Sequence, residues 1–258
     1  MVEKNYVLRP ALCALAIGAA FVLASNPALA GAHRGAVAFA TATGATVPAA
    51  EAATAGAGQT WDFDHDRAQQ SPQDWITIGG DWRVLVDHDA PSDPNVLGLP
   101  GYGLPHVQQL GLWFESFIST NYQLAIPKNA PQYSDFAYEA KLKLWGGAFG
   151  SYAGLVFRYS DPQNYYVLAA ACPKDYIALY RMSGGQMTLI KQAPAELVRT
   201  RWYSLKVDAK GGHFVAYLDG KQVLAADDGS FTQGRIGVWS QNDSRASFDN
   251  IKLSPSTP

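Results

Sequence analysis

The sequence predicts an all-β domain, a two-sheet antiparallel β-sandwich, preceded by a signal peptide and a disordered linker. Short segments of alternating apolar and polar residues recur from Trp61 onward, turn residues separate them, and no amphipathic helical segment interrupts them. The charged fraction of 16% lies below the usual ~25% and excludes a highly charged disordered chain. With 20 Lys and Arg against 22 Asp and Glu, the chain also has no positive surplus for binding nucleic acid.

Residues 1–30 have the three parts of a secretory signal peptide. Lys4 and Arg9 precede an apolar run, Ala11–Ala24, and Ala28 and Ala30 occupy the small-residue positions before a cleavage site. A retained signal anchor is the alternative, but the run is shorter than the ~20 apolar residues that span a bilayer. We therefore expect a secreted or periplasmic protein with no stable membrane anchor after cleavage.

Residues 31–58 consist almost entirely of Ala, Gly and Thr. The segment lacks the bulky apolar residues from which a core forms, and its composition is typical of a flexible linker. The folded domain is therefore expected to span residues 59–258. Cys172 is the single cysteine left after signal cleavage, so the domain is expected to fold without an intrachain disulfide.

The strands expected in this domain are 6–11 residues long and have period two. In Asp135–Trp145, alternate residues are apolar, as in a strand with one buried face. The strands that follow are expected at Tyr152–Ser160, Asn164–Ala171, Asp175–Met182, Gln186–Lys191, Arg201–Ala209, His213–Leu218, Arg235–Gln241 and Ala246–Leu253. Asp219-Gly220 is the signal of a type I′ hairpin turn. Pro100–Asn121 does not fit this rhythm and is interpreted as a long loop or as a lid over a binding face.

The order of the motifs resembles a jelly roll of the concanavalin A-like lectin/glucanase superfamily, and in particular bacterial exported LamG-like or 3-keto-disaccharide hydrolase-like domains. The motifs that carry the resemblance are short and lie between residues 60 and 254, among them Trp61-Asp62-Phe63-Asp64, Ala153-Gly154-Leu155-Val156-Phe157-Arg158, Asn164-Tyr165-Tyr166-Val167, Gly234-Arg235-Ile236-Gly237-Val238-Trp239 and Phe248-Asp249-Asn250-Ile251. The resemblance implies the sandwich fold, but one fold hosts binders, hydrolases and inert modules.

The resemblance also implies a saccharide on the concave face of one sheet. Period two places alternate residues on that face, and Tyr165 is assigned to it by resemblance. The candidate ligand-binding residues are Arg158, Tyr165, Tyr176, Tyr180, Trp239 and Gln241. Aromatic rings suit the apolar faces of sugars, and a guanidinium donates paired hydrogen bonds. The alternative is that these aromatic residues fill the core. Ala169, Ala171 and Ala178 stand where the family pattern more often has Arg or Asn, which leaves fewer polar groups to orient a ligand.

No catalytic motif is evident in the sequence. Glycosidases need two carboxyl groups at defined spacing, and the glutamates of the mature chain do not form such a pair. Glu139 shares its strand face with Lys141 and Lys143, which predicts an ion pair. Asp87, His88 and Asp89 cluster at a strand end without an assignable partner.

A structural calcium ion is predicted at Asp62, Asp64 and Asp249. Asp62, Asp64 and Asp66 alternate, so in a strand they share one face, and oxygen ligands suit Ca²⁺. Asp249 joins them by resemblance, because relatives hold calcium near the first and last strands. Solvated acids at a strand end are the alternative, and no other cofactor is expected.

The leading hypothesis is an exported carbohydrate-binding module without an evident catalytic motif. A glycoside hydrolase of the 3-keto-disaccharide type and a structural module with no ligand are the alternatives. The oligomeric state is not predicted.

Overall fold

The computed structural model describes residues 58–100, 122–147 and 150–256. The chain separates into two units, residues 1–49 and 50–258, and the described residues all belong to the second. The predicted signal peptide, nearly all of the predicted linker and the segment 101–121 lie outside the described residues, so these expectations stay predictions. Within the described ranges, no helix is long and apolar enough to cross a membrane.

Fifteen strands are present in the described residues, and all the strand pairs are antiparallel. Eight form sheet A, in the order β13-β12-β11-β6-β15-β4-β3 with β1 also on β15, and seven form sheet B, in the order β10-β9-β8-β7-β14-β5-β2. The bounds in sheet A are β1 Gln59–Trp61, β3 Arg83–Val86, β4 Asn95–Gly98, β6 Phe136–Gly146, β11 Trp202–Lys210, β12 His213–Leu218, β13 Lys221–Asp227 and β15 Arg245–Pro255. Those in sheet B are β2 Trp75–Ile78, β5 Tyr122–Pro127, β7 Ser151–Asp161, β8 Asn164–Cys172, β9 Tyr176–Ser183, β10 Gln186–Pro194 and β14 Arg235–Gln241.

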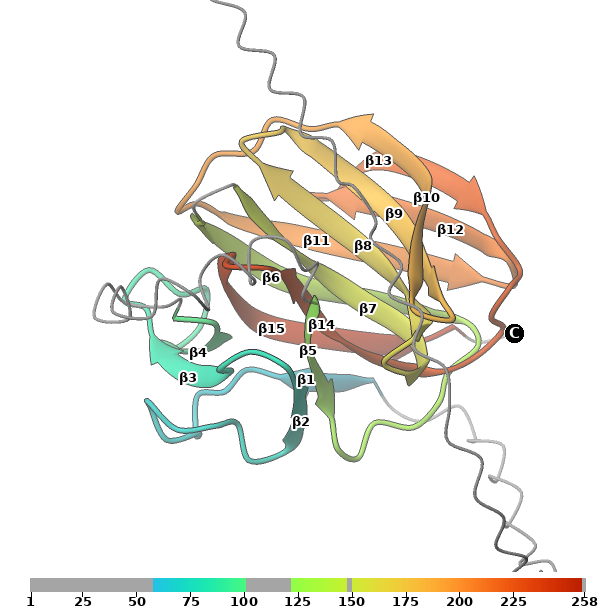
Figure 1. Ribbon diagram of the computed structural model, residues 1–258. Helices are drawn as coiled ribbons and strands as arrows, with labels where there is room; N and C mark the ends of the chain where they lie inside the picture. The colour runs from blue at the N-terminus through green and yellow to red at the C-terminus, as the bar shows by residue number, and fades with distance from the viewer. Residues whose placement is uncertain (1–57, 101–121, 148–149, 257–258) are drawn as a thin grey trace, which may run out of the picture. The chain divides into compact units, whose positions relative to one another are not determined.

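The two sheets lie face to face (Figure 1), which confirms the predicted sandwich. The inner faces carry the main core, with Phe136, Tyr138 and Leu142 from sheet A against Phe157 and Leu168 from sheet B. The Tyr138 hydroxyl donates a 2.7 Å hydrogen bond across the sandwich to a backbone carbonyl of β14. The alternation predicted for β6 is therefore confirmed.

The turn predicted at Asp219-Gly220 is confirmed, whereas the strand pattern predicted at residues 62–66 is wrong. Asp219 and Gly220 have φ angles of 49° and 77°, and Leu218 pairs with Lys221, as a two-residue type I′ turn requires. The alternation at residues 62–66 was misinterpreted, because β1 ends at Trp61 and Phe63 has φ of 64°. A left-handed residue turns the chain, so Asp62, Asp64 and Asp66 do not share a strand face. Cys172 is free and buried at the end of β8.

Candidate binding face and polar clusters

The face of sheet B that points away from sheet A, here the outer face of sheet B, brings most of the predicted ligand-binding residues together. Strand register places side chains across this face in rows. One row joins Leu124, Trp239, Gly154, Ala169 and Ala178 across β5, β14, β7, β8 and β9. The neighbouring rows contain Gln241 opposite Tyr122, Tyr176 opposite Ala171, Tyr180 opposite Val167, and Tyr165 opposite Met182. Five of the six predicted residues thus share one face.

Trp239 and Tyr165 form the floor of this face. Their relative exposures are 1% and 0%, so both rings are buried. The Trp239 ring lies 5.7 Å from the ring of Tyr122, and the Tyr165 ring lies 6.1 Å from that of Tyr159. The Trp239 indole nitrogen and the Tyr165 hydroxyl are buried without a hydrogen-bond partner that meets normal geometry. These two residues are therefore a packed aromatic layer in which the Trp239 indole nitrogen interacts with the Tyr165 hydroxyl and partly offsets the rise in its pKa that burial causes.

Gly154 keeps the floor flat beside Trp239. A Cβ atom at this position would lie 2.1 Å from the carbonyl oxygen of Leu168, which no ordinary contact allows. Glycine here lets β7 and β8 approach closely, as glycine in a strand often does.

Tyr176 and Tyr180 stand higher on the face and are partly exposed. They lie two positions on either side of Ala178 on β9, and their hydroxyl oxygens meet at 3.5 Å. Ala178 is fully buried beneath them. Burial and the hydrogen bond to Tyr176 raise the pKa of Tyr180 well above its usual value. The alanine row thus provides the space in which the two phenol rings converge.

Sequence reasoning did not name several residues of this face. Tyr122, Leu124, Tyr159, Met182 and Met187 pack in the same apolar cluster as Trp239, with Tyr152 at its margin. Tyr152 and Met182 continue the period-two pattern of β7 and β9, so the alternation contained the signal for both. Tyr122 lies on β5, a strand that the sequence pattern did not delimit.

On this face, the paired rows of the described strands β5, β14, β7, β8 and β9 carry no Asp, Glu or His side chain. The polar atoms they offer are phenol hydroxyls, an indole nitrogen and the amide of Gln241. Such a face can stack on a ring and exchange neutral hydrogen bonds, but it lacks the paired carboxyl groups of a glycosidase.

Arg158 does not lie on this face, so its predicted placement was wrong. It has φ of 49° at a bulge in β7, where the register shifts between Phe157 and Asp161. A bulge places two consecutive side chains on the same side of a strand. The guanidinium therefore turns into the sandwich, 5.0 Å from the Phe214 ring. It donates to the carbonyls of Phe231 (2.6 Å), Ser134 (2.9 Å) and Gly211 and is 1% exposed.

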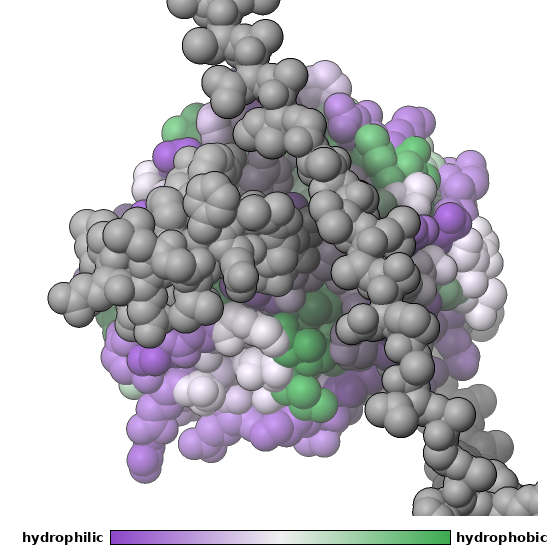
Figure 2. Space-filling model, viewed as in Figure 1, coloured by the Kyte–Doolittle hydropathy of each residue, from purple (hydrophilic) through white to green (hydrophobic). Residues whose placement is uncertain are grey.

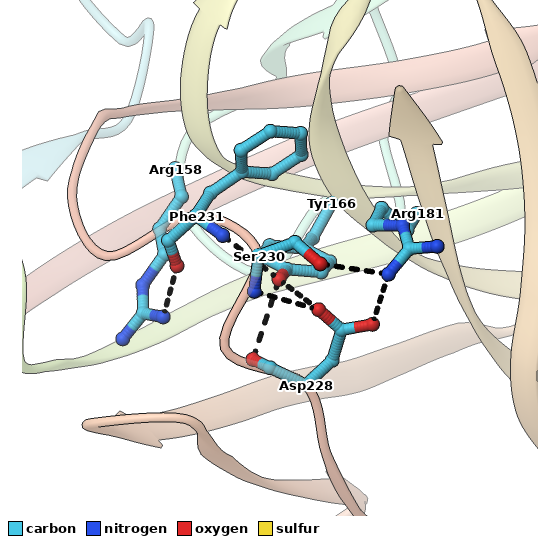
Figure 3. Close-up of polar contacts among 6 residues, drawn as sticks. All are labelled: Arg158, Tyr166, Arg181, Asp228, Ser230 and Phe231. Carbon is cyan, nitrogen blue, oxygen red and sulfur yellow. Dashed lines mark hydrogen bonds and ion pairs between the residues drawn. The ribbon is translucent and has the colours of Figure 1, made fainter.

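Beside Arg158, a second polar network holds the segment that precedes β14 (Figure 3). Asp228 accepts hydrogen bonds from the Tyr166 hydroxyl (2.6 Å) and from the backbone N–H of Ser230 (2.9 Å), and it forms an ion pair with Arg181 at 2.6 Å. Burial alone raises the pKa of Asp228, but these donors outweigh it and leave the pKa lowered. Burial and the same hydrogen bond raise the pKa of Tyr166 to about 12. These contacts stabilise the loop between β13 and β14.

The residues of the predicted calcium site are only partly brought together. The Ser92 hydroxyl donates to Asp64 (3.1 Å) and to Asp249 (3.0 Å), so these two carboxylates meet through Ser92. Burial raises the pKa of Asp249 despite these hydrogen bonds. Asp62 instead accepts a hydrogen bond from the backbone N–H of Asp64. In the part of the chain that the structure describes, no group of three or more His, Cys, Asp or Glu is arranged to hold a metal ion. The donor set therefore does not fit the expected calcium site, and calcium binding stays a prediction.

A buried ion pair lies on the outer face of sheet A. Lys143 on β6 contacts Asp87 at 2.8 Å, and their side chains are 1% and 6% exposed. The ammonium also lies 4.2 Å from the centroid of the Trp145 ring. The ion pair predicted for Glu139 with Lys141 or Lys143 is not among those of the described residues, and Glu139 instead accepts a hydrogen bond from the Ser204 hydroxyl. The sequence placed Asp87 in a cluster with His88 and Asp89 but assigned it no partner, because Lys143 is distant in sequence.

The sequence matches one protein family and one characterised relative over part of its length. The family described as 3-keto-alpha-glucoside-1,2-lyase-like domain matches residues 118–254. The levanase of Bacillus subtilis (strain 168) is 30% identical over 121 residues, which are 46% of this chain and 17% of levanase. The chain therefore spans about a sixth of that relative.

Solved structures share the fold at low sequence identity. The carbohydrate-binding module CBM66 from Bacillus subtilis matches with a TM-score of 0.54 and 23% identity, covering 69% of this chain and 94% of the module. The carbohydrate recognition domain of Emp47p matches with a TM-score of 0.51 and 13% identity, covering 76% of this chain and 94% of that domain. These likenesses confirm the expected two-sheet β-sandwich fold. The family match covers more than half of the chain, and the protein therefore belongs to the 3-keto-alpha-glucoside-1,2-lyase-like domain family.

Proposed function

We propose that this protein is an exported carbohydrate-binding module that binds its ligand on the outer face of sheet B. The observation that carries the proposal is the convergence of the Tyr176 and Tyr180 hydroxyls at 3.5 Å beside the row of Trp239. Both tyrosines are partly exposed, so part of each side chain is available at the surface.

The chemistry of these groups suits a neutral sugar. A phenol ring covers the C–H face of a pyranose or furanose, and its hydroxyl exchanges hydrogen bonds with ring substituents. Gln241, at the opposite side of the face, adds an amide that can both donate and accept. The paired rows themselves carry no charge, and the nearest cation is Lys174, whose ammonium lies 5.5 Å from the centroid of the Tyr152 ring at the margin of the face.

The surface beside this face supports a ligand longer than one sugar unit. Figure 2 shows a hydrophobic patch over β2 and β5 on the same side of the domain. Ile76 of β2 is 43% exposed and pairs with Ile126 of β5. This apolar surface and the two tyrosines lie towards opposite edges of sheet B, so a ligand that reaches both must be an extended chain that crosses the sheet.

The relatives support the same ligand class. The module CBM66 and the Emp47p domain are named for carbohydrate binding, and the name of levanase indicates a polysaccharide substrate. The signal peptide pattern of residues 1–30 supports action outside the cytoplasm, and residues 59–258 are the proposed binding domain.

The test is retention of the protein in native gels that contain levan, xylan, laminarin or soluble cellulose derivatives. We expect retention by at least one polysaccharide and its loss in the Tyr176→Ala/Tyr180→Ala double variant. Tyr217→Ala is the matched control, because Tyr217 is a partly exposed tyrosine on the outer face of sheet A, beside Lys206. Retention by no polysaccharide would refute the proposal and favour a structural module. Equal retention of the double variant would show that binding occurs elsewhere and would refute the outer face of sheet B as the site.

A second candidate function is catalysis on 3-keto glycosides, of the hydrolase type expected from the resemblance or the lyase type in the family's description. Family membership is the observation that favours it. Product formation from 3-keto-glucosides by the full chain, at a rate proportional to protein concentration, would support an enzyme. No product from either 3-keto or unmodified glycosides would leave binding as the function.

A further inference from the structure

A pocket of about 280 Å³ lies away from the outer face of sheet B, at an edge of the sandwich. Its walls come from β1, from the residue before β2 and from the loop after β5, so both sheets contribute to it. It is lined by Gln59, Thr60, Trp61, Asp74, Asn129 and Ala130. The volume lies just below the ~300–1,000 Å³ of typical small-molecule pockets and suits a ligand of one sugar unit.

The walls of the pocket are fixed by contacts that need no ligand. Trp61 pairs with Ile251 of β15, and its ring lies 6.0 Å from the buried ring of Trp75 in an edge-to-face arrangement. The backbone N–H of Lys128 donates a 2.7 Å hydrogen bond to the carbonyl of Asp74. The side chains of Asp74 and Asn129 are thus held at the rim by their backbones while they themselves stay exposed.

The side chains that line the pocket combine one aromatic ring with hydrogen-bonding groups. Trp61 supplies a partly exposed indole, Asp74 a carboxylate, Gln59 and Asn129 amides, and Thr60 a hydroxyl. The Gln59 side-chain oxygen is buried and has no hydrogen-bond partner. A buried acceptor without a donor is unfavourable.

The charge around the pocket selects among ligands. No Lys or Arg is among the lining residues, and Asp74 places a negative charge at the rim. Burial, then the charges of Asp74 and Asp62, raises the pKa of nearby Asp66, in keeping with a negative local field. Lys128, whose ammonium donates to the carbonyl of Gln73, lies beside the pocket but does not line it. The lining itself offers an anion no cation, whereas the Asp74 carboxylate accepts hydrogen bonds from adjacent hydroxyls of a neutral sugar.

We propose that this edge pocket is a second, independent binding site that takes a single neutral sugar unit, with Trp61 against its ring and Asp74, Asn129 and Gln59 on its hydroxyls. The site does not depend on the outer face of sheet B, because it uses none of the residues of that face.

Isothermal titration calorimetry on the full chain tests this site with fructose, glucose, galactose and xylose, and with glucuronate and glucosamine as charged probes. We expect at least one neutral sugar to bind, and Asp74→Asn and Asn129→Ala each to weaken it at least tenfold. Thr60→Trp, a change at an exposed position of β1, should block the pocket. Asp81→Asn is the matched control, since Asp81 is an exposed carboxylate outside the pocket.

Near-ultraviolet circular dichroism and thermal unfolding confirm that each variant is folded. Binding of none of the neutral sugars, binding of a charged probe alone, or unchanged affinity in both Asp74→Asn and Thr60→Trp would overturn the proposal. The two proposed sites fail separately, because Tyr176→Ala/Tyr180→Ala should leave monosaccharide binding at the pocket unchanged. Loss of pocket binding in that double variant would likewise contradict independent sites.

Discussion

Lys143→Met should destabilise the domain by about 3–5 kcal/mol, the usual cost of removing one partner from a buried ion pair. The substitution leaves Asp87 buried, with a side chain 6% exposed, and without the ammonium that lay 2.8 Å away. Asp89, at 3.7 Å, adds little to the pairing because its side chain is 86% exposed. Loss of the contact between the ammonium and the Trp145 ring, at 4.2 Å, adds about 0.5–2 kcal/mol.

Urea unfolding followed by tryptophan fluorescence measures this cost. Lys206→Met is the matched control, because Lys206 and Asp208 also lie 2.8 Å apart but their side chains are 32% and 37% exposed. The control should lose no more than about 1 kcal/mol. Adding Asp87→Asn to Lys143→Met should recover part of the loss, since the buried charge is then removed.

Salt gives a second measurement on the same variants. The free energy that Lys143 contributes should change little between 0.1 and 1 M NaCl, because buried pairs are weakly screened. A loss below about 1 kcal/mol in Lys143→Met, with no recovery in the double variant, would show that the pair is solvated and that this reasoning is wrong.

Three further substitutions test the core. Arg158→Met should cost at least about 3 kcal/mol in urea unfolding, because three charge-assisted hydrogen bonds from a buried guanidinium to backbone carbonyls are lost; a cost near zero would mean that water replaces the guanidinium. Gly154→Ala should strongly lower the melting temperature, since its Cβ would lie 2.1 Å from a carbonyl oxygen, whereas Gly229→Ala, with nothing within 4 Å, should not. Asp228→Asn should flatten the loss of stability in acid. A carboxyl whose pKa is below its ordinary 3.8 stabilises the fold above that pH and loses this contribution as the pH falls through the folded pKa; an unchanged acid transition would contradict this.

The sequence was sufficient for the architecture because the signals of antiparallel sheets are local. The alternation in β6 and the Asp219-Gly220 turn each depend on a few neighbouring residues. The strands β2, β3 and β4 are four residues each, too short to show a period, and could not be delimited. Their place in the sheets depends on pairing with distant strands.

The errors at the candidate site have one physical cause. Period two holds only while every residue is extended, and Arg158 and Phe63 both adopt positive φ. Such conformations are uncommon for residues other than Gly, Asn and Asp, so the residue types at these two positions did not predict them. At Arg158 one bulge moved a cation from the ligand-binding face into the interior. At Phe63 one turn separated Asp62 from the carboxylates it was expected to join.

The position of the buried cations, away from the outer face of sheet B, leads to a last prediction. Arg158 is bound by carbonyls inside the sandwich and Lys143 by Asp87 on the outer face of sheet A, so neither cation reaches the described rows around Trp239. Burial and the hydrogen bond to Tyr176 raise the pKa of Tyr180, which therefore stays protonated across the neutral range. Polysaccharide affinity of the outer face of sheet B should then be constant between about pH 6 and 9 and between 0.05 and 0.5 M NaCl, because no group there changes charge and no ion pair is screened. A titration midpoint inside that range, or an affinity that falls steeply with salt, would place a charged side chain in the binding site and contradict the neutral face.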